Sequence, residues 1–274
     1  MSTPIRAAEL AASLTRVRPH VGRDTELAAI NAIRIEANGN YLFTVGTDRY
    51  TFAISRADTV DHGPWAAHLR RDDVPVVVAW LERLNPDAIV ELGVEAVNDD
   101  TIIVFQSLAG SLRMHDETAN RRHFPDWRKL ARDILQKAPA DAGFTGYNSG
   151  YLARFKGVGP TLHAWQNGPR SPLVLAEDGG GFIGFVMPAH SEQKNRDQVV
   201  EKWIGSLRRT DAMVMGARYD LTAIWRDRHG DPWQYSGRDG QHGEPLMDLV
   251  GIDDDPWLLS QVIAEYGPLT RSEV

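Results

Sequence analysis

The feature of this sequence that most limits its fold is an order of predicted elements that occurs twice before residue 117. A strand, a helix and three more strands are expected between about residues 3 and 54, and the same order follows between residues 65 and 115. The two copies are alike in pattern and not in their residues. A duplicated unit of this kind predicts an α+β fold, with helices packed against antiparallel sheets.

The first copy begins with an amphipathic helix at residues 6–18. Its apolar face is built from residues at helical spacing, namely Ala7, Leu10, Ala11, Leu14 and Val17. Pro19 ends the helix. Three strands are then predicted, at residues 29–37, 41–45 and 49–54. Asn38-Gly39-Asn40 favours a hairpin turn between the first two, because Asn and Gly tolerate a positive φ.

The second copy repeats this order, and its helix has Pro75 in the first turn. Its elements are expected at residues 65–69, 70–84, 88–97, 101–106 and 111–115. A third, partial copy has one short helix and three strands. These lie at residues 148–155, 162–165, 173–176 and 182–187, with a hairpin turn at 177–181.

We expect three parts along the chain: two full copies at 1–120, a linker and partial copy at 121–190, and a C-terminal segment at 191–274. The C-terminal segment should contain a charged helix, two strands around a turn, and a final helix. The charged helix is expected at 191–209 and the final helix at 256–266. The two strands are expected at 212–225 and 233–235, with the turn between them at 227–231.

Composition excludes several classes of protein. The chain has no cysteine, so it forms no disulfide and holds no metal through thiolates. No stretch approaches the roughly 20 apolar residues that span a bilayer, and residues 1–10 lack the layout of a secretory signal, which predicts a cytoplasmic protein. The net charge of −7 argues against a general nucleic-acid coat. It leaves room for one locally basic face that contacts DNA.

Three short stretches carry a resemblance to a known family. The first is Ile35 to Asp48, the second is the pair of strands at 171–175 and 182–190 with Met187-Pro188 near its end, and the third is Phe124-Pro125-Asp126-Trp127-Arg128. In order and spacing they resemble the DNA sliding clamps of the bacterial DNA polymerase III beta type. The resemblance covers about residues 3 to 190, and it implies a ring protein that acts in DNA replication without catalysis.

The chain departs from that family in three respects. The family has three domains of two strand-helix units each, whereas this sequence contains three such units. His190 stands where the family usually has Arg, and the chain continues to Val274, well past the usual end. This short form resembles clamp-like proteins encoded by actinobacterial phages.

The resemblance implies that helices line a central hole and hold DNA by its phosphates, without reading bases. The candidate cations lie on or beside the three predicted helices: Arg16, Arg18, Arg23, Arg70, Arg71, Arg83, Arg154 and Lys156. The alternative is that these are ordinary solvated helix charges. Acidic residues near the second helix would offset its arginines: Asp72, Asp73 and Glu82.

The resemblance also implies a groove that accepts a short peptide from a polymerase. Its expected lining is Leu173, Phe185, Val186, Met187 and Pro188. Methionine suits such a surface because its side chain is flexible and polarizable. The alternative is simple core packing at the end of a strand.

No catalytic or metal site is expected. Residues 227–231 lack the spaced acidic positions of a calcium loop and favour a tight hairpin. His229 and His242 would need two further ligands to hold zinc. Gly179-Gly180-Gly181 is not followed by the Lys-Ser/Thr of a phosphate loop. No Gly-x-Ser-x-Gly nucleophile elbow is present. We therefore expect no cofactor.

Three functions remain open. The first is a homo-oligomeric processivity clamp that encircles double-stranded DNA and binds a polymerase and a clamp loader. The second is a clamp-derived decoy or regulator that does not encircle DNA, and the third is an enzyme with its site within 195–274. Residues 191–274 could also cover Met187 and Pro188, or supply the subunit contact that the missing units made.

Overall fold

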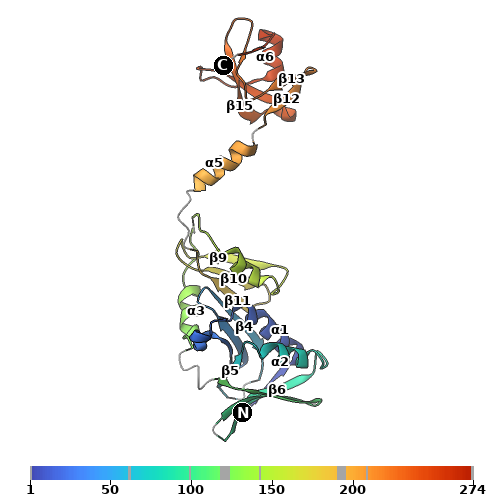
Figure 1. Cartoon of the computed structure of the whole chain (residues 1–274), viewed down its shortest axis with the longest axis vertical. Helices are drawn as coiled ribbons and strands as arrows, with labels where there is room; N and C mark the ends of the chain where they lie inside the picture. Colours follow the sequence, from blue (N-terminus) through green and yellow to red (C-terminus); the bar gives the residue numbers. More distant parts are fainter. Residues whose placement is uncertain are drawn as a thin grey trace. The chain divides into compact units, whose positions relative to one another are not determined.

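The computed structural model describes residues 2–60, 63–98, 100–117, 124–141, 143–189, 196–207 and 209–272. The chain forms two compact units, Met1–Glu192 and Gln193–Val274. Figure 1 shows the elements of each unit. His190, which stands where the resembled family usually has Arg, lies outside the described residues.

The first unit contains two antiparallel sheets that exchange their first strands. The four-stranded sheet has the order β1 (Ser2–Arg6), β6 (Ile89–Val97), β7 (Asp100–Ser107) and β8 (Gly110–His115). The seven-stranded sheet begins with β5 (Trp65–Arg70), β2 (Ala32–Asn38), β3 (Tyr41–Thr47) and β4 (Thr51–Asp58). The first strand of each sequence copy thus pairs with the strands of the other copy, which interlocks the two.

Helices α1 (Ala7–Val17) and α2 (Val74–Leu81) pack together beneath the sheets. The apolar stripe predicted for α1 is confirmed, because Leu10, Leu14 and Val17 are fully buried. Helix α2 is shorter than the predicted span of 70–84. Arg70 still belongs to β5, and the following turn leads to a helix that starts at Val74 with Pro75 in its first turn.

The third copy extends the seven-stranded sheet with β11 (Phe182–Val186), β10 (Leu173–Glu177) and β9 (Leu162–Gln166). Strand β11 pairs with β4 from Phe182↔Ser55 to Val186↔Thr51. The predicted helix at 148–155 is one turn of α-helix, α4 (Ser149–Leu152), followed by a 3-10 turn, η4 (Ala153–Phe155). Gly184 lets η4 approach the sheet, since a Cβ there would lie 2.2 Å from the Phe155 ring.

Helix α3 (Trp127–Leu135) covers the other face of this sheet. Figure 1 shows α1 and α3 on opposite sides of β4. Asp126 caps α3 by accepting a hydrogen bond from the Lys129 amide at 3.1 Å. The apolar face of α3 packs on aromatic residues of three strands, Phe43, Phe52 and Phe185. The sheet therefore has an apolar core on each face.

The second unit begins with α5 (Arg196–Leu207) and a hairpin of β12 (Asp211–Val214) and β13 (Ala217–Asp220). A five-stranded sheet follows in the order β17 (Trp257–Leu258), β16 (Pro245–Leu249), β15 (Pro232–Asp239), β14 (Trp225–Arg226) and β18 (Thr270–Arg271). Helix α6 (Leu259–Tyr266) closes its core around Trp233 and Met247.

Two sequence predictions for the second unit need correction, and one strand was missed. The single strand expected at 212–225 is broken by a turn, because Met215 and Gly216 both adopt positive φ. Strand β16 was not predicted. The last helix starts at Leu259 and not at 256, since Trp257 and Leu258 pair with β16. The turn at 227–231 is confirmed, and Asp227 accepts hydrogen bonds from the amides of His229 and Asp231.

In the described ranges, no helix is both long and apolar enough to cross a membrane, and no group of acidic or histidine side chains is arranged to hold a metal ion.

Candidate nucleic-acid interface

Four arginines from three separate segments converge in the first unit. Arg18 begins the 3-10 turn η1 (Arg18–His20) after α1, Arg23 follows this turn, Arg71 precedes α2, and Arg154 lies in η4. Burial lowers the pKa of the Arg71 guanidinium, and the charges of Arg23, Arg18 and Arg154 lower it further. We call these four residues the arginine cluster. Each was a predicted DNA-contacting residue.

Two arginines of the cluster each have a side-chain donor without a hydrogen-bond partner among the described residues. The Nε atoms of Arg18 and Arg71 are buried, and neither finds a partner among the described residues. The Arg71 side chain is 16% exposed, and its contact with the solvated Asp72 carboxylate is long, at 3.5 Å. Because like charges held together at partly buried positions destabilise one another, such a cluster favours binding of an anion.

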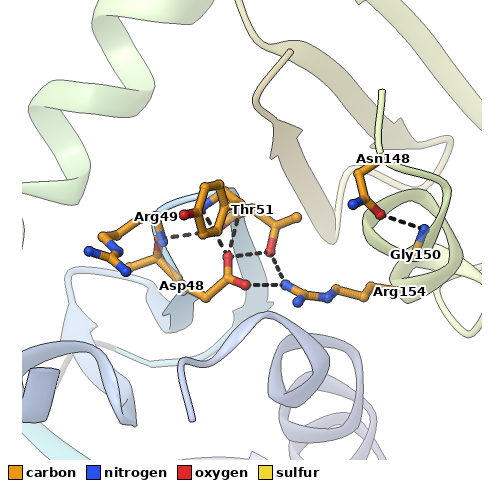
Figure 2. A network of polar contacts seen from close by, with 8 residues as sticks. Asp48, Arg49, Thr51, Asn148, Gly150 and Arg154 are labelled. Atoms are coloured by element: carbon orange, nitrogen blue, oxygen red, sulfur yellow. Dashed lines mark hydrogen bonds and ion pairs between the residues drawn. The ribbon is translucent and has the colours of Figure 1, made fainter. Parts of the chain in front are cut away.

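Arg154 is the member of the cluster that the protein holds in place (Figure 2). Its Nη1 donates to Asp48 Oδ2 at 2.6 Å and to Thr51 Oγ1 at 2.7 Å. The other Asp48 oxygen accepts from the Thr51 amide at 2.8 Å. Burial alone would raise the pKa of Asp48, but the hydrogen bonds from Arg154 and Thr51, together with the charge of Arg154, outweigh it and the pKa is lowered. This network joins the third copy to the β3–β4 turn of the first.

A buried histidine lies behind the cluster. His20 packs its ring 4.5 Å from that of Phe155, and neither ring nitrogen has a hydrogen-bond partner in the described part of the chain. Burial, with a smaller contribution from Arg154, lowers the pKa of His20 to about 3. The imidazole is therefore neutral at physiological pH. Sequence reasoning missed this residue, because only tertiary contacts distinguish it from a surface histidine.

The remaining predicted cations lie elsewhere. Arg16 is already paired, since its two Nη atoms donate to the Glu177 carboxylate at 2.9 and 3.0 Å. Arg70 is exposed and lies 3.9 Å from Glu117. Arg83 and Lys156 are exposed side chains. The structure thus brings together four of the eight predicted cations, and it neutralises Arg16 inside α1.

The residues expected to line a peptide groove are divided between both faces of the sheet. Phe185, 2% exposed, stacks on Phe52 at 5.3 Å under α3, and Val186 is fully buried in the core that contains α1. These two residues are in core packing, which was the alternative for the groove. Met187 is 43% exposed, and its amide donates to the Tyr50 carbonyl. Pro188 and Leu173 are half-buried.

Comparison with known proteins shows what this architecture is. No protein-family model matches the chain, and no curated protein matches it. Among solved structures, the DNA polymerase III subunit beta from Pseudomonas aeruginosa is similar, with a TM-score of 0.56 and 14% identity over 69% of this chain and 66% of that one. The Helicobacter pylori beta clamp bound to a DNA ligase peptide has a TM-score of 0.53 and 12% identity, over 69% and 66%.

A putative DNA polymerase III beta subunit from Eubacterium rectale is also similar, with a TM-score of 0.52 and 11% identity over 70% of this chain and 66% of that chain. The chain therefore has the DNA-clamp fold that its sequence predicted. It spans slightly less than two thirds of the length of these clamps.

Proposed function

We propose that this chain is a sliding-clamp-like replication factor that holds double-stranded DNA by its phosphates and performs no catalysis. The arginine cluster carries this proposal, because it gathers four guanidinium charges beside the helices of a clamp fold. Arginine suits phosphate because its planar fork donates two hydrogen bonds at once. Contacts to phosphate alone hold DNA without selecting a sequence, which permits sliding.

Encirclement would require several copies of the chain. Within the described residues, β8 is an edge strand of the four-stranded sheet and β9 is an edge strand of the seven-stranded sheet, while β1 and β5 form the other two edges. Pairing of β8 in one copy with β9 in the next would continue the sheets around a ring and cover both of these edges. We propose a homo-oligomer of this kind, in the cytoplasm, that a clamp loader opens.

Partner binding is the second part of the proposal. The Helicobacter pylori clamp of similar fold was solved with a DNA ligase peptide. By analogy, we propose that a polymerase peptide docks at the exposed Met187 and the adjacent Pro188 and Leu173.

A second candidate function is a clamp-derived regulator or decoy that binds replication proteins without encircling DNA. Two observations favour it. The chain covers 66% of the similar clamp from Pseudomonas aeruginosa, and it carries a separate unit at Gln193–Val274. A decoy of this type needs no DNA contact.

DNA binding distinguishes these functions. We expect the Arg18→Glu/Arg71→Glu double variant to bind a 30-base-pair duplex at least about tenfold more weakly than the wild type, with a salt slope smaller by about 2. Arg170→Glu is the matched control, since Arg170 is an exposed arginine outside the cluster. Fluorescence anisotropy over a range of salt concentrations measures both quantities. Equal affinities for the double variant and the control would reject the proposed DNA interface.

A further inference from the structure

An open cleft lies on the face of the seven-stranded sheet that α3 covers, opposite the face that packs on α1. It has a volume of about 460 Å³, within the range of roughly 300–1,000 Å³ that binding sites occupy. Its lining is mostly apolar and comes from β3, β4, β11 and α3: Phe43, Ile54, Ile183, Trp127 and Leu135. None of these was a predicted site residue, because they meet only when α3 folds onto the sheet.

The wall of the cleft that α3 forms is held rigidly by one carboxylate. Glu36 on β2 accepts hydrogen bonds from Arg128 Nη2 at 2.7 Å and from Trp127 Nε1 at 3.3 Å. Arg34 Nε donates to the same carboxylate at 2.8 Å. Burial would raise the pKa of Glu36, but the hydrogen bonds from Arg34 and Arg128 lower it overall, so Glu36 stays ionised. A preformed wall reduces the entropy lost on binding.

The rim of the cleft is basic although the whole chain is acidic. Arg56, Arg128 and Arg132 contribute to its lining. Arg128 is engaged by Glu36, whereas Arg56 and Arg132 form no ion pair with any residue that the structure describes. The Arg56 guanidinium lies over the Tyr41 ring at 4.8 Å, which holds it near the opening. Two cations without a carboxylate partner, beside an apolar cleft, match a ligand with an apolar anchor and carboxylates.

We propose that this cleft binds a short acidic peptide, with one apolar side chain in the cleft and carboxylates on Arg56 and Arg132. Gly180 and Gly181 are part of the cleft lining and have no side chain to block a peptide backbone. A single-stranded nucleic acid fits less well, because base stacking needs an exposed ring face and Trp127 is only 6% exposed. This site goes beyond the proposed function, since it requires neither DNA binding nor a ring.

A phage-displayed library of random 12-residue peptides, selected against the full chain, is the probe. We expect enriched peptides to share an aromatic or aliphatic residue next to Asp or Glu. Binding of a labelled enriched peptide should weaken at least about tenfold in Leu135→Asp and in Arg132→Glu. The matched controls are Leu130→Asp and Lys137→Glu. Leu130 is 46% exposed, similar to Leu135 at 41%, and both control residues lie outside the cleft lining.

Several outcomes would overturn the proposal: no enriched peptide, enrichment of basic peptides, or equal losses in the cleft variants and their controls. An acidic peptide could instead bind the arginine cluster. Affinity would then fall in Arg71→Glu and not in Leu135→Asp, which would also reject the cleft. Because Arg71→Glu tests the DNA interface separately, failure of the cleft leaves the proposed DNA binding unaffected. Thermal unfolding of each variant checks that its fold is retained.

Discussion

At the scale of single residues, the proposed DNA interface depends on which of the predicted arginines already have a carboxylate partner. Arg16 and Arg18 are two positions apart at the end of α1, yet Arg16 forms a two-bonded ion pair with Glu177 and Arg18 retains an unsatisfied Nε. The sequence predicted both as DNA contacts. The sequence does not show that Arg16 is paired and Arg18 is not. The carboxylate that pairs with Arg16 belongs to Glu177, which comes close only when the sheet has folded.

The buried His20 provides a test of stability. His20→Leu should raise the free energy of unfolding at pH 7 by about 1–2 kcal/mol, since two unsatisfied buried ring nitrogens are removed. In the wild type, the unfolded state binds a proton below its usual pKa of about 6.5, whereas the folded pKa is about 3. The free energy of unfolding should therefore fall by up to about 1.4 kcal/mol for each pH unit as the pH is lowered from about 6.5 to about 3.

Urea unfolding from pH 7.5 to 3.5 measures this effect. The His20→Leu variant should lose this part of the pH dependence and keep the part due to carboxylates. A variant that is less stable at pH 7, with an unchanged slope, would contradict a buried, neutral and unpaired imidazole at His20.

Asp48 and Arg154 separate a structural role from a DNA-binding role. Asp48→Asn should destabilise the first unit by about 1–2 kcal/mol, because charge-assisted hydrogen bonds to Arg154 and Thr51 are weakened. Since the folded pKa of Asp48 is depressed, this contribution is present above pH ~4 and is lost as pH falls through the folded pKa.

Arg154→Ala should reduce both stability and DNA affinity, whereas Asp48→Asn should leave DNA affinity unchanged or higher. Parallel denaturation and anisotropy measurements on the two variants check this. Equal losses of DNA affinity in both would assign Arg154 a purely structural role.

At the scale of elements, local sequence patterns predicted the positions of helices and turns, but they did not predict which strands pair. The amphipathic stripe of α1 and the turn at 38–40 lie where the sequence predicted them. The exchange of β1 and β5 between the two sheets, and the pairing of β4 with β11, join segments with no local signal. For the same reason, sequence reasoning placed Phe185 at a groove, although α3 packs over it.

The attachment of α3 through Glu36 is open to test. Glu36→Gln should speed amide hydrogen exchange in α3 roughly tenfold, because the ionised acceptor of Arg128 and Trp127 is lost. Asp133→Asn is the control, since Asp133 lies on the same helix and pairs with the exposed Lys129. Exchange that is equally fast in both variants, or unchanged in Glu36→Gln, would contradict the assignment of Glu36 as the anchor.

At the scale of the whole molecule, the two units have separate cores. The clusters around Leu10 and Phe185 lie within the first unit, and the cluster around Trp233 lies within the second. Removal of residues 193–274 should therefore leave the first unit folded, with a midpoint of unfolding within about 2 °C of the matching transition in the full chain. Calorimetry of both chains tests this, and loss of the transition would show that the units depend on each other.

The proposed clamp function requires that the chain encircles DNA. The most direct test is retention on a linear duplex whose biotinylated ends are blocked with streptavidin after the protein has bound. If the ring is closed, the protein should remain on the DNA through a wash in 1 M NaCl when both ends are blocked, and it should be lost when one end is free. The reason is that contacts to phosphate are weak at this salt concentration, whereas a closed ring cannot leave DNA with blocked ends. Equal loss from blocked and open DNA would contradict encirclement and favour the non-encircling regulator.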